Sequence, residues 1–393
     1  MDIFSGFLEN KYRKEIKKTG ISKAGDEIFK QKSQKYALLL KNISLAKALV
    51  LKQELLVCGG DCALHENAVR GILKTLNIVI SADIRTLSKL ETRLKTQGFF
   101  EKERKDILNF INSQKDSELF TLRNKKFVNN NTYIMAILNV TPDSFSDGGL
   151  NLDEKTCIEN IKKMIETKVD IIDVGGESTR PSAKSVSIEE ELDRVIPKIR
   201  LIRSMTDIPI SIDTYKHEVA REALENGADS INYVRGYEID ENMLKVVYDF
   251  KTPFFLMHSR GNSANMQKMT EYSDIVEDIF DEINNSYEKL LQVLDNRKKI
   301  IIDPGIGFAK TTEQNWEIIS KVKSFFKYGS PVLMGVSRKS FIKNSFDIKD
   351  NILKDEITDI LSMFFTFSGV NFIRVHNYEK AYRLKKIMSF LEQ

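Results

Sequence analysis

From about residue 132 onward, a single repeating pattern occupies the chain. Short apolar runs rich in Ile and Val alternate with charged segments of helical period. Amphipathic stretches of the length usual for crossover helices lie between the runs, at Glu189–Met205, Lys216–Asn226 and Asp274–Leu294. The eight predicted strands are Tyr133–Val140, Val169–Val174, Ile208–Asp213, Ser230–Val234, Phe254–His258, Lys299–Asp303, Val332–Val336 and Phe372–His376.

The composition of these runs indicates a parallel sheet. They are continuously apolar rather than alternating, which is typical of strands buried on both faces. Eight β/α units in about 260 residues predict a closed (β/α)8 TIM barrel of the α/β class, with a doubly wound open sheet as the alternative.

Nearly every predicted strand carries a polar or charged residue at or near its end. In a barrel these ends share one rim, which is the rim that carries catalysis. The strand ends therefore predict an active site. The residues concerned are Asn139, Asp213, Asn232, His258, Asp303, Ser337 and His376.

Composition excludes several classes of partner. The 393 residues include 60 basic and 56 acidic side chains, a net charge of only +4, so no overall field favours binding to nucleic acid or to an anionic membrane. No apolar run approaches the length of a membrane span, and the N-terminus lacks a signal pattern. Three sparse cysteines suit a reducing compartment. These features predict a soluble cytoplasmic protein.

The first part of the chain has a different pattern. We expect residues 1–115 to form a small α/β domain and residues 116–393 to form the barrel. Between them, the segment Ser113–Asn131 has the pattern of a hairpin that closes the bottom of the barrel. The first domain is expected to have strands at Glu54–Val57 and Ile78–Ile80 and helices at Ser33–Lys52, His65–Leu76, Ile84–Gln97 and Glu101–Asn112.

One cluster in this domain is reminiscent of a metal site. Cys58 and Cys62 flank a Gly-rich turn and His65 follows, and thiolates and imidazole are zinc ligands. A fourth ligand is missing, however, and the spacing is not that of a standard zinc knuckle. The sequence therefore favours buried thiols beside a turn.

Two segments carry a resemblance to a known family. Ile137-Leu138-Asn139-Val140-Thr141-Pro142-Asp143-Ser144-Phe145-Ser146-Asp147-Gly148-Gly149 and Asp173-Val174-Gly175-Gly176-Glu177-Ser178-Thr179-Arg180-Pro181 each follow an apolar strand with a polar, Gly-bearing loop. They resemble the first and second signatures of dihydropteroate synthase. The resemblance covers about residues 119–393 and implies a TIM barrel.

The resemblance implies a role for residues at most strand ends. Carboxylates in apolar strands must be paired or bound, and they accept well from the N–H donors of a pterin, although a buried salt bridge is the structural alternative. By resemblance the catalytic residues are Asn139, Asp213, Lys339, Arg374 and His376. The pterin would be held by Asp213, Asn232, Met257, Asp303 and Lys339, pyrophosphate by Asn139, Arg180, Arg374 and His376, and p-aminobenzoate by Phe145, Thr179, Pro181, Phe308, Lys339 and Ser340.

The resemblance implies a transferase of folate biosynthesis. Its small-molecule substrates would be 6-hydroxymethyl-7,8-dihydropterin pyrophosphate and p-aminobenzoate, and its products 7,8-dihydropteroate and pyrophosphate. Mg²⁺, with Asn139 as ligand, would neutralise the leaving group. Sulfonamides would bind as p-aminobenzoate mimics, and the family suggests a homodimer.

Two other functions are compatible with parts of the pattern. A pterin-binding methyltransferase-type domain would share the barrel and the pterin-binding residues but would not need the anion-binding Arg374 and His376. A non-catalytic pterin-binding protein would be expected to have lost one of Asn139, Arg180, Lys339 or Arg374, and all are present. The chain departs from the family pattern without loss of a proposed ligand at Ala136, Tyr233, Arg235, Ala309 and Asn377.

Overall fold

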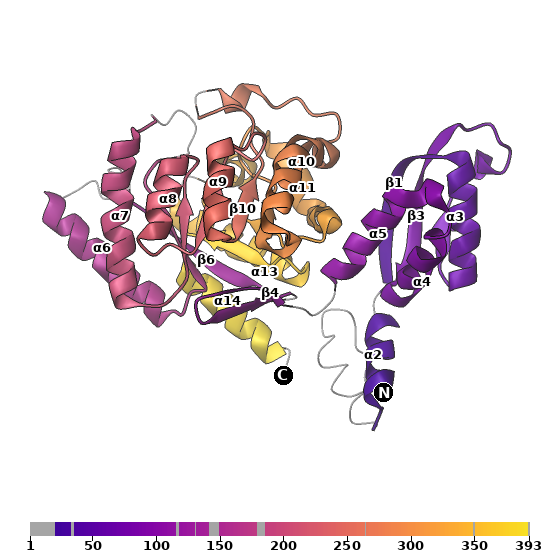
Figure 1. Ribbon diagram of the computed structural model, residues 1–393, viewed down its shortest axis with the longest axis horizontal. Coiled ribbons are helices and arrows are strands. Elements are labelled where there is room, and N and C mark those ends of the chain that lie inside the picture. The colour runs from indigo at the N-terminus through magenta and orange to yellow at the C-terminus, as the bar shows by residue number, and fades with distance from the viewer. Residues whose placement is uncertain are drawn as a thin grey trace. The chain divides into compact units, whose positions relative to one another are not determined.

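The computed structural model describes residues 20–32, 35–114, 118–129, 131–140, 149–178, 185–263, 265–348 and 350–391. The chain divides into two compact units, which are described separately (Figure 1). One comprises Met1–Gln114 with Met388–Gln393, and the other comprises Lys115–Ile387.

The larger unit is a closed parallel barrel. Its strand order is β11-β10-β9-β8-β7-β6-β13-β12, and a parallel bridge between Ile302 and Val332 joins β11 to β12. The predicted barrel is confirmed, and the open doubly wound sheet is excluded by this order. The strands are β6 (Tyr133–Asn139), β7 (Ile171–Gly175), β8 (Ile210–Asp213), β9 (Ser230–Tyr233), β10 (Phe254–Met257), β11 (Ile300–Asp303), β12 (Leu333–Met334) and β13 (Phe372–Val375).

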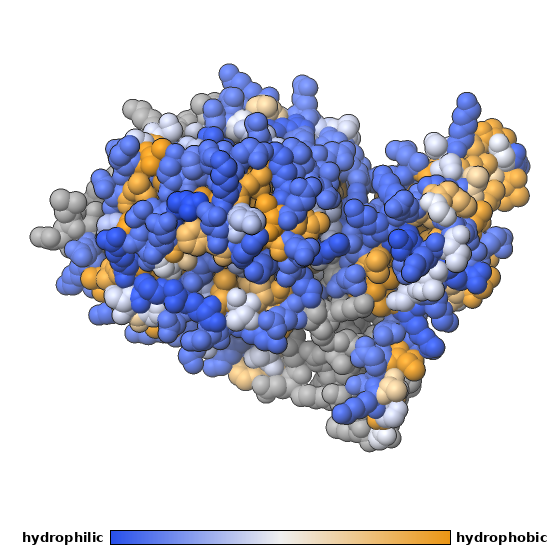
Figure 2. All heavy atoms as spheres, in the orientation of Figure 1, coloured by the Kyte–Doolittle hydropathy of each residue, from blue (hydrophilic) through white to orange (hydrophobic). Residues whose placement is uncertain are grey.

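Helices surround these strands, and hydrophilic residues cover most of the barrel face shown in Figure 2. The helices are α6 (Gly149–Glu166), α7 (Ile188–Met205), α8 (His217–Glu225), α9 (Glu241–Phe250), α10 (Ile275–Leu294), α11 (Thr312–Ser320), α12 (Ser340–Phe346), α13 (Asn351–Phe367) and α14 (Tyr378–Leu391). Short 3₁₀ helices are η5 (Met266–Lys268), η6 (Arg297–Lys299) and η7 (Val322–Tyr328).

Local sequence explains where these helices begin. Ser187 precedes α7 and accepts a hydrogen bond from the Glu190 N–H, while the Glu190 side chain accepts from the Ser187 N–H, which is a capping box. Val195, Ile199 and Ile202 then recur at helical spacing and are buried against the sheet. The crossover helices predicted from the same periodicity are confirmed at α7, α8 and α10.

The barrel interior has an apolar layer at the amino ends of its strands. This layer packs against a hairpin formed by β4 (Glu118–Leu122) and β5 (Lys125–Val128), which confirms the predicted hairpin. The rings of Phe120 and Phe127 have their centroids 6.1 and 5.8 Å from that of Phe372. The cluster comprises Leu119, Phe120, Leu122, Phe127, Tyr133, Met135, Ile171, Phe255, Ile301, Leu333 and Phe372. Apolar packing thus closes this end and leaves the other end for polar groups.

The smaller unit contains a three-stranded antiparallel sheet in the order β1-β3-β2. Alternating burial along β3 directs Leu76, Ile78, Ile80 and Ala82 into one hydrophobic core. Its elements are α2 (Lys23–Lys32), β1 (Lys35–Ser44), α3 (Leu45–Cys58), β2 (Asp61–Ala63), η2 (Glu66–Ala68), β3 (Thr75–Asp83), α4 (Ile84–Leu94), η3 (Gly98–Phe100) and α5 (Glu101–Ser113).

Three predictions for this unit were wrong. The predicted helix Ser33–Lys52 is strand β1 followed by the start of α3, because pairing with β3 outweighs helix propensity up to the Ser44 cap. The predicted strand Glu54–Val57 is the end of α3, where the buried side chains follow helical spacing. The predicted helix His65–Leu76 is the short η2 and a loop in which Gly71 adopts a positive φ of 70°.

Cys58 and Cys62 are buried free thiols, as expected for cysteines beside a Gly-rich turn. His65 instead caps η2, since its Nδ1 accepts the Asn67 N–H at 3.1 Å. Within the described residues, no group of three or more His, Cys, Asp or Glu side chains could hold a metal ion. None of the helices described here combines the length and the apolar character needed to cross a membrane.

The apolar layer yields a prediction about stability. Phe127 is fully buried between the hairpin and the barrel, so Phe127→Ala should lower the free energy of unfolding by about 3–5 kcal/mol. The exposed Tyr248 on α9 provides the control, and Tyr248→Ala should change it by less than about 0.5 kcal/mol. Urea denaturation followed by circular dichroism measures both. Equal effects of the two substitutions would show that the hairpin does not stabilise the barrel.

Candidate active site at the carboxyl ends of the strands

The carboxyl ends of the barrel strands carry a layer of polar side chains above the apolar layer. Strand pairing places Asp213 beside Asn232. On its other side Asp213 pairs with Gly175, and Gly175 in turn pairs with Asn139. On the opposite side of the barrel, Met257 pairs with Asp303. The register therefore brings five of the predicted site residues, Asn139, Asp213, Asn232, Met257 and Asp303, to the carboxyl rim of the barrel.

Arg374 connects two carboxylates across this layer. Its Nε donates to Asp173 Oδ2 at 2.6 Å and its Nη2 donates to Asp213 Oδ2 at 2.5 Å. Asn232 also donates to Asp173 Oδ2, at 3.1 Å. Asp173 is completely buried, so its charge requires such partners. The three strands β7, β8 and β13 are thereby joined at the rim.

Each of these carboxylates retains one unused acceptor atom. The Oδ1 atoms of Asp173 and Asp213 are buried and have no hydrogen-bond partner among the residues that the structure describes. Burial raises the pKa of Asp213 to about 7, although the charge of Arg374 opposes the shift, and the negative charge of Asp173 reinforces it. A carboxylate with a spare buried oxygen is a strong acceptor for a ligand N–H group.

A second pair of charged groups lies at the ends of β11 and β12. Asp303 is buried, and its Oδ1 accepts the Gly305 N–H at 2.8 Å. Burial raises its pKa, while the nearby Lys339 opposes the rise. Lys339 donates to the Ile306 carbonyl, and its Nζ lies 4.8 Å from the centroid of the Phe308 ring. Burial lowers the pKa of Lys339 to about 8, against the effect of Asp303.

Asn139 and His376 line a cavity of about 400 Å³. His376 shares a hydrogen bond between its Nδ1 and Ser337 Oγ, 3.0 Å apart, which fixes the ring beside the cavity. The first residues of α14 also line it, and the Asn377 side chain accepts the Lys380 N–H at 3.2 Å. The start of a helix and several amide and cationic groups favour a bound anion. The lining residues are Ile137, Leu138, Asn139, Asn160, Lys163, Met164, Arg338, His376, Asn377, Tyr378 and Glu379.

The remaining predicted residues fall into two groups. Met257 is buried at the end of β10, Ser340 begins α12 directly after Lys339, and Phe308 follows β11. The other four, which are Phe145, Thr179, Arg180 and Pro181, lie outside the described residues.

The family departure at Tyr233 does not enter the site. Its side chain packs into the core outside the strands, and its hydroxyl donates to the Glu238 carbonyl at 3.2 Å. Successive side chains on a strand point to opposite faces, so Tyr233 points away from the interior that Asn232 occupies.

Sequence reasoning missed the role of Asp173. It lies two residues before Gly175 and two after Ile171, and therefore faces the barrel interior. A charged residue at an inward position of an apolar strand was the available signal.

Comparisons with known proteins agree with this geometry. The model of a family described as "Pterin binding enzyme" matches residues 135–376. The dihydropteroate synthase of Synechocystis sp. is 41% identical over 260 residues, which is 66% of this chain and 90% of that protein. A Clostridium difficile dihydropteroate synthase structure determined in the presence of pteroic acid has 39% identity and a TM-score of 0.61, covering 66% of this chain and 96% of that one. The Yersinia pestis dihydropteroate synthase in a sulfonamide drug complex has 30% identity and a TM-score of 0.64, with 70% and 98% covered.

The raised pKa of Asp213 yields a prediction about pH. Because the native pKa of about 7 exceeds the ordinary value of 3.8, Asp213 contributes stability below about pH 4 that is lost as the pH rises through about 7. Asp213→Asn cannot ionise, so its free energy of unfolding should rise relative to wild type over this range, by at most about 1.4 kcal/mol per pH unit. Denaturation at a series of pH values measures the difference. A difference that does not vary with pH would contradict the assignment.

Proposed function

Because the chain belongs to the dihydropteroate synthase family of pterin-binding enzymes, we propose that its barrel joins 6-hydroxymethyl-7,8-dihydropterin pyrophosphate to p-aminobenzoate. The reaction releases 7,8-dihydropteroate and pyrophosphate. The observation that carries the proposal is the polar layer at the strand ends. There, carboxylates whose buried oxygens have no partner among the described residues lie on the same rim as a cavity lined by Asn139 and His376.

The carboxylate layer suits the pterin ring. The free Oδ1 of Asp213 would accept from the 2-amino group or a ring N–H, and Asn232 and Asp303 supply further hydrogen-bonding atoms on the rim. Met257 offers an apolar surface at the same level as Asp303, and Lys339 would bind an acceptor atom of the ring. A flat ring with several donors thus meets complementary acceptors.

The cavity beside β6 and β13 suits the pyrophosphate. Asn139 and His376 line it, and we assign Arg180 and Arg374 to the same leaving group. Arg374 uses its Nε and Nη2 on carboxylates. It would therefore act mainly through its charge and its remaining nitrogen.

The residues around the cavity fit a bound Mg²⁺. This ion commonly takes only one or two protein oxygens together with waters and substrate phosphates, so a full set of protein ligands is not required. Asn139 would hold it through its amide oxygen, beside the pyrophosphate. When bound, Mg²⁺ neutralises charge on the leaving group.

The p-aminobenzoate would lie between the Phe308 ring and the start of α12. Lys339 lies against this ring, and Ser340 provides a hydroxyl next to it in sequence. Phe145, Thr179 and Pro181 are assigned to the same pocket by family resemblance. Sulfonamides would occupy this pocket, as the sulfonamide complex of the Yersinia pestis relative suggests.

Catalysis follows from the charge distribution. Breaking the C–O bond to pyrophosphate leaves positive charge on the pterin methylene, and the ionised forms of Asp213 and Asp303 favour that charge. The neutral arylamine then attacks the methylene carbon, forms the C–N bond and loses its proton. Since the amine is already nucleophilic, a strong general base is not needed. The chain's residues bind and orient the two substrates and stabilise the separated charges.

An assay of pyrophosphate release tests this function. The wild-type protein should release pyrophosphate from the pterin substrate in step with the consumption of p-aminobenzoate. Lys339→Met should reduce kcat/KM by about 10- to 150-fold, because a charged hydrogen bond contributes about 1.5–3 kcal/mol. The exposed Lys321, paired with Glu317 on α11, is a matched control, and Lys321→Met should stay within about twofold of wild type.

The outcomes separate the alternatives. Tight pterin binding without pyrophosphate release would indicate a non-catalytic pterin-binding protein. Release that does not depend on p-aminobenzoate would indicate another acceptor.

We also propose that the protein acts as a cytoplasmic homodimer. The buried free thiols suit a reducing compartment. For the dimer, α13 presents an exposed apolar face. At a rotation of 100° per helical residue, the five apolar side chains of this face lie within an arc of about 120°. The side chains on it, with their exposed fractions, are Ile352 (65%), Leu353 (44%), Ile360 (61%), Met363 (40%) and Phe364 (41%).

Sedimentation equilibrium tests the dimer. Wild-type protein should dimerise, and Ile360→Asp should raise the dimer dissociation constant at least about tenfold, because it places a charge in a buried apolar contact. Tyr248→Asp, at an exposed position on α9, should have no effect. A wild-type protein that remains monomeric, or an Ile360→Asp protein that dimerises normally, would contradict the proposal.

A further inference from the structure

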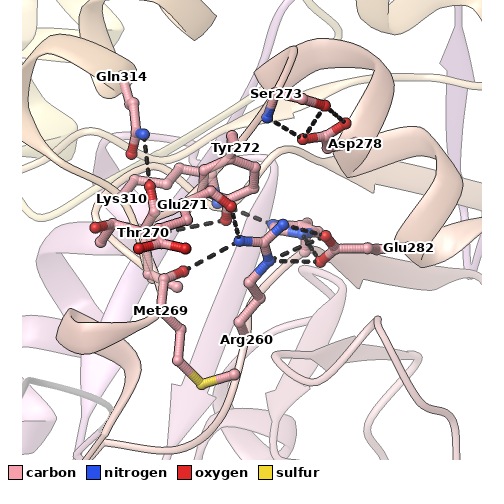
Figure 3. Close-up of polar contacts among 12 residues, drawn as sticks. Arg260, Met269, Thr270, Glu271, Tyr272, Ser273, Asp278, Glu282, Lys310 and Gln314 are labelled. Carbon is pink, nitrogen blue, oxygen red and sulfur yellow. Dashed lines mark hydrogen bonds and ion pairs between the residues drawn. The ribbon is translucent and has the colours of Figure 1, made fainter.

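A chain of polar side chains lies next to the loop that carries Phe308. We call residues Gly305–Lys310 the β11 loop. Lys310 contacts His258, and His258 contacts Glu282. Glu282 in turn contacts Arg260 (Figure 3). The proposed function gives none of these four residues a role.

The direction of the hydrogen bonds is fixed by the chemistry of the groups. His258 is completely buried, and its Nε2 lies 2.9 Å from Glu282 Oε2. A carboxylate can only accept, so Nε2 carries the proton and Nδ1 is the acceptor. Lys310 donates to that Nδ1 at 2.9 Å and to the Phe308 carbonyl at 2.9 Å. Lys310 therefore links the backbone of the β11 loop to His258.

Burial has a large effect on these groups. Lys310 is only 4% exposed, and burial lowers its pKa well below the ordinary value. Burial also lowers the pKa of His258 to about 3, so the ring is neutral and its Nδ1 remains free to accept. A buried lysine is costly unless its hydrogen bonds are made. Since burial of Lys310 beside Phe308 is costly in itself, its presence there calls for an explanation other than a gain in stability.

The other end of the chain is anchored to a second loop. Arg260 donates from Nε to both oxygens of Glu282, at 3.0 and 2.9 Å, and from Nη1 to the Glu271 carbonyl at 2.6 Å. Its guanidinium carbon also lies 3.7 Å from the centroid of the Tyr272 ring. The Tyr272 hydroxyl then donates to the Ala309 carbonyl at 3.1 Å. Two consecutive carbonyls of the β11 loop are thus held, one by Lys310 and one by Tyr272.

The backbone of the β11 loop needs these anchors. Gly305 has a φ of 69°, and a Cβ atom there would approach the His258 carbonyl oxygen to 1.8 Å, so the loop lies directly on the end of β10. Ala309 also has a positive φ, 49°, which costs an L-residue about 1–2 kcal/mol. Asn315 accepts the Gly307 N–H at 2.7 Å. The conformation that presents Phe308 is therefore held by its surroundings rather than by local preference.

We propose that Lys310, acting through His258 and Glu282, is a positioning residue that fixes Phe308 against Lys339. This inference rests on the proposed function, in which Phe308 and Lys339 line the p-aminobenzoate pocket. It predicts that the polar chain sets the affinity for the arylamine substrate and for sulfonamides. The pterin should be less affected. Asp213 and Asn232 lie on other strands, and the hydrogen bonds of Lys310 go to His258 and the Phe308 carbonyl rather than to Met257, Asp303 or Lys339.

The test uses the full-length protein with Lys310→Met, which keeps the length of the side chain and removes its donors. The KM for p-aminobenzoate should rise at least about tenfold, and the KM for the pterin substrate should change less than about threefold. Calorimetric titration with a sulfonamide, in the presence of pterin and pyrophosphate, should show an affinity loss of similar size. Glu282→Gln weakens the chain without removing Lys310 and should give a smaller rise in the same KM.

Arg203→Met is the matched control. Arg203 is another largely buried cation of the barrel, and it donates to Asp229 at 2.7 Å and to the Gly227 carbonyl at 2.9 Å, near the amino ends of β8 and β9. Its loss should lower stability and leave both KM values within about twofold of wild type. A general loss of stability in the Lys310→Met variant would therefore not imitate the expected result.

The outcomes keep the two proposals apart. Wild-type protein that shows no p-aminobenzoate-dependent release of pyrophosphate would refute the proposed function. An active wild type with Lys310→Met showing unchanged KM for p-aminobenzoate, or equal changes for both substrates, would refute the positioning role alone. If Lys310→Met does not fold, the same comparison with Glu282→Gln decides, and an unchanged KM for p-aminobenzoate in that variant also refutes the role.

Discussion

The site depends on one partly buried cation held between two carboxylates. Arg374 on β13 donates to Asp173 and to Asp213, and so joins strands that are far apart in sequence. Without Arg374, two negative charges would remain in the interior with little solvent, which is costly. Without the carboxylates, the partly buried guanidinium would lose the partners of its Nε and Nη2. The contact with Arg374 explains why Asp213 can be both largely buried and available. Its Oδ2 accepts from Arg374, while its Oδ1 has no partner within the described part of the chain.

This arrangement requires a dry interior, which the opposite end of the barrel provides. The hairpin β4–β5 and the aromatic layer around Phe372 fill the barrel below the polar residues. Charges above such a layer interact more strongly than charges in water, since less solvent screens them. The same burial acts on Asp303 and Lys339 across the rim, raising one pKa and lowering the other. Apolar packing at one end thus determines the electrostatics at the other.

The sequence predicted the barrel well because its signal is repeated and consistent. The predicted strands are mainly apolar and nearly all carry a polar residue at or near the end, so Asp213, Asn232 and Asp303 could be placed on one rim. It could not predict the partners of those residues, since the contacts of Arg374 with Asp173 join positions 201 residues apart. In the smaller unit the signal was weaker. Leu-rich β1 has the composition of a helix, and only pairing with β3 makes it a strand.

Burial also brings the pKa values of two oppositely charged side chains of the site close to each other. The pKa of Asp213 is raised to about 7 and that of Lys339 is lowered to about 8, so both groups lie close to a change of charge near neutral pH. A ligand that donates to Asp213 favours its ionised form, and a ligand that accepts from Lys339 favours its charged form. A pterin that does both would therefore establish the charges that the reaction needs as it binds. Under the proposed function, binding of the pterin and activation of the site would be linked through the same two residues.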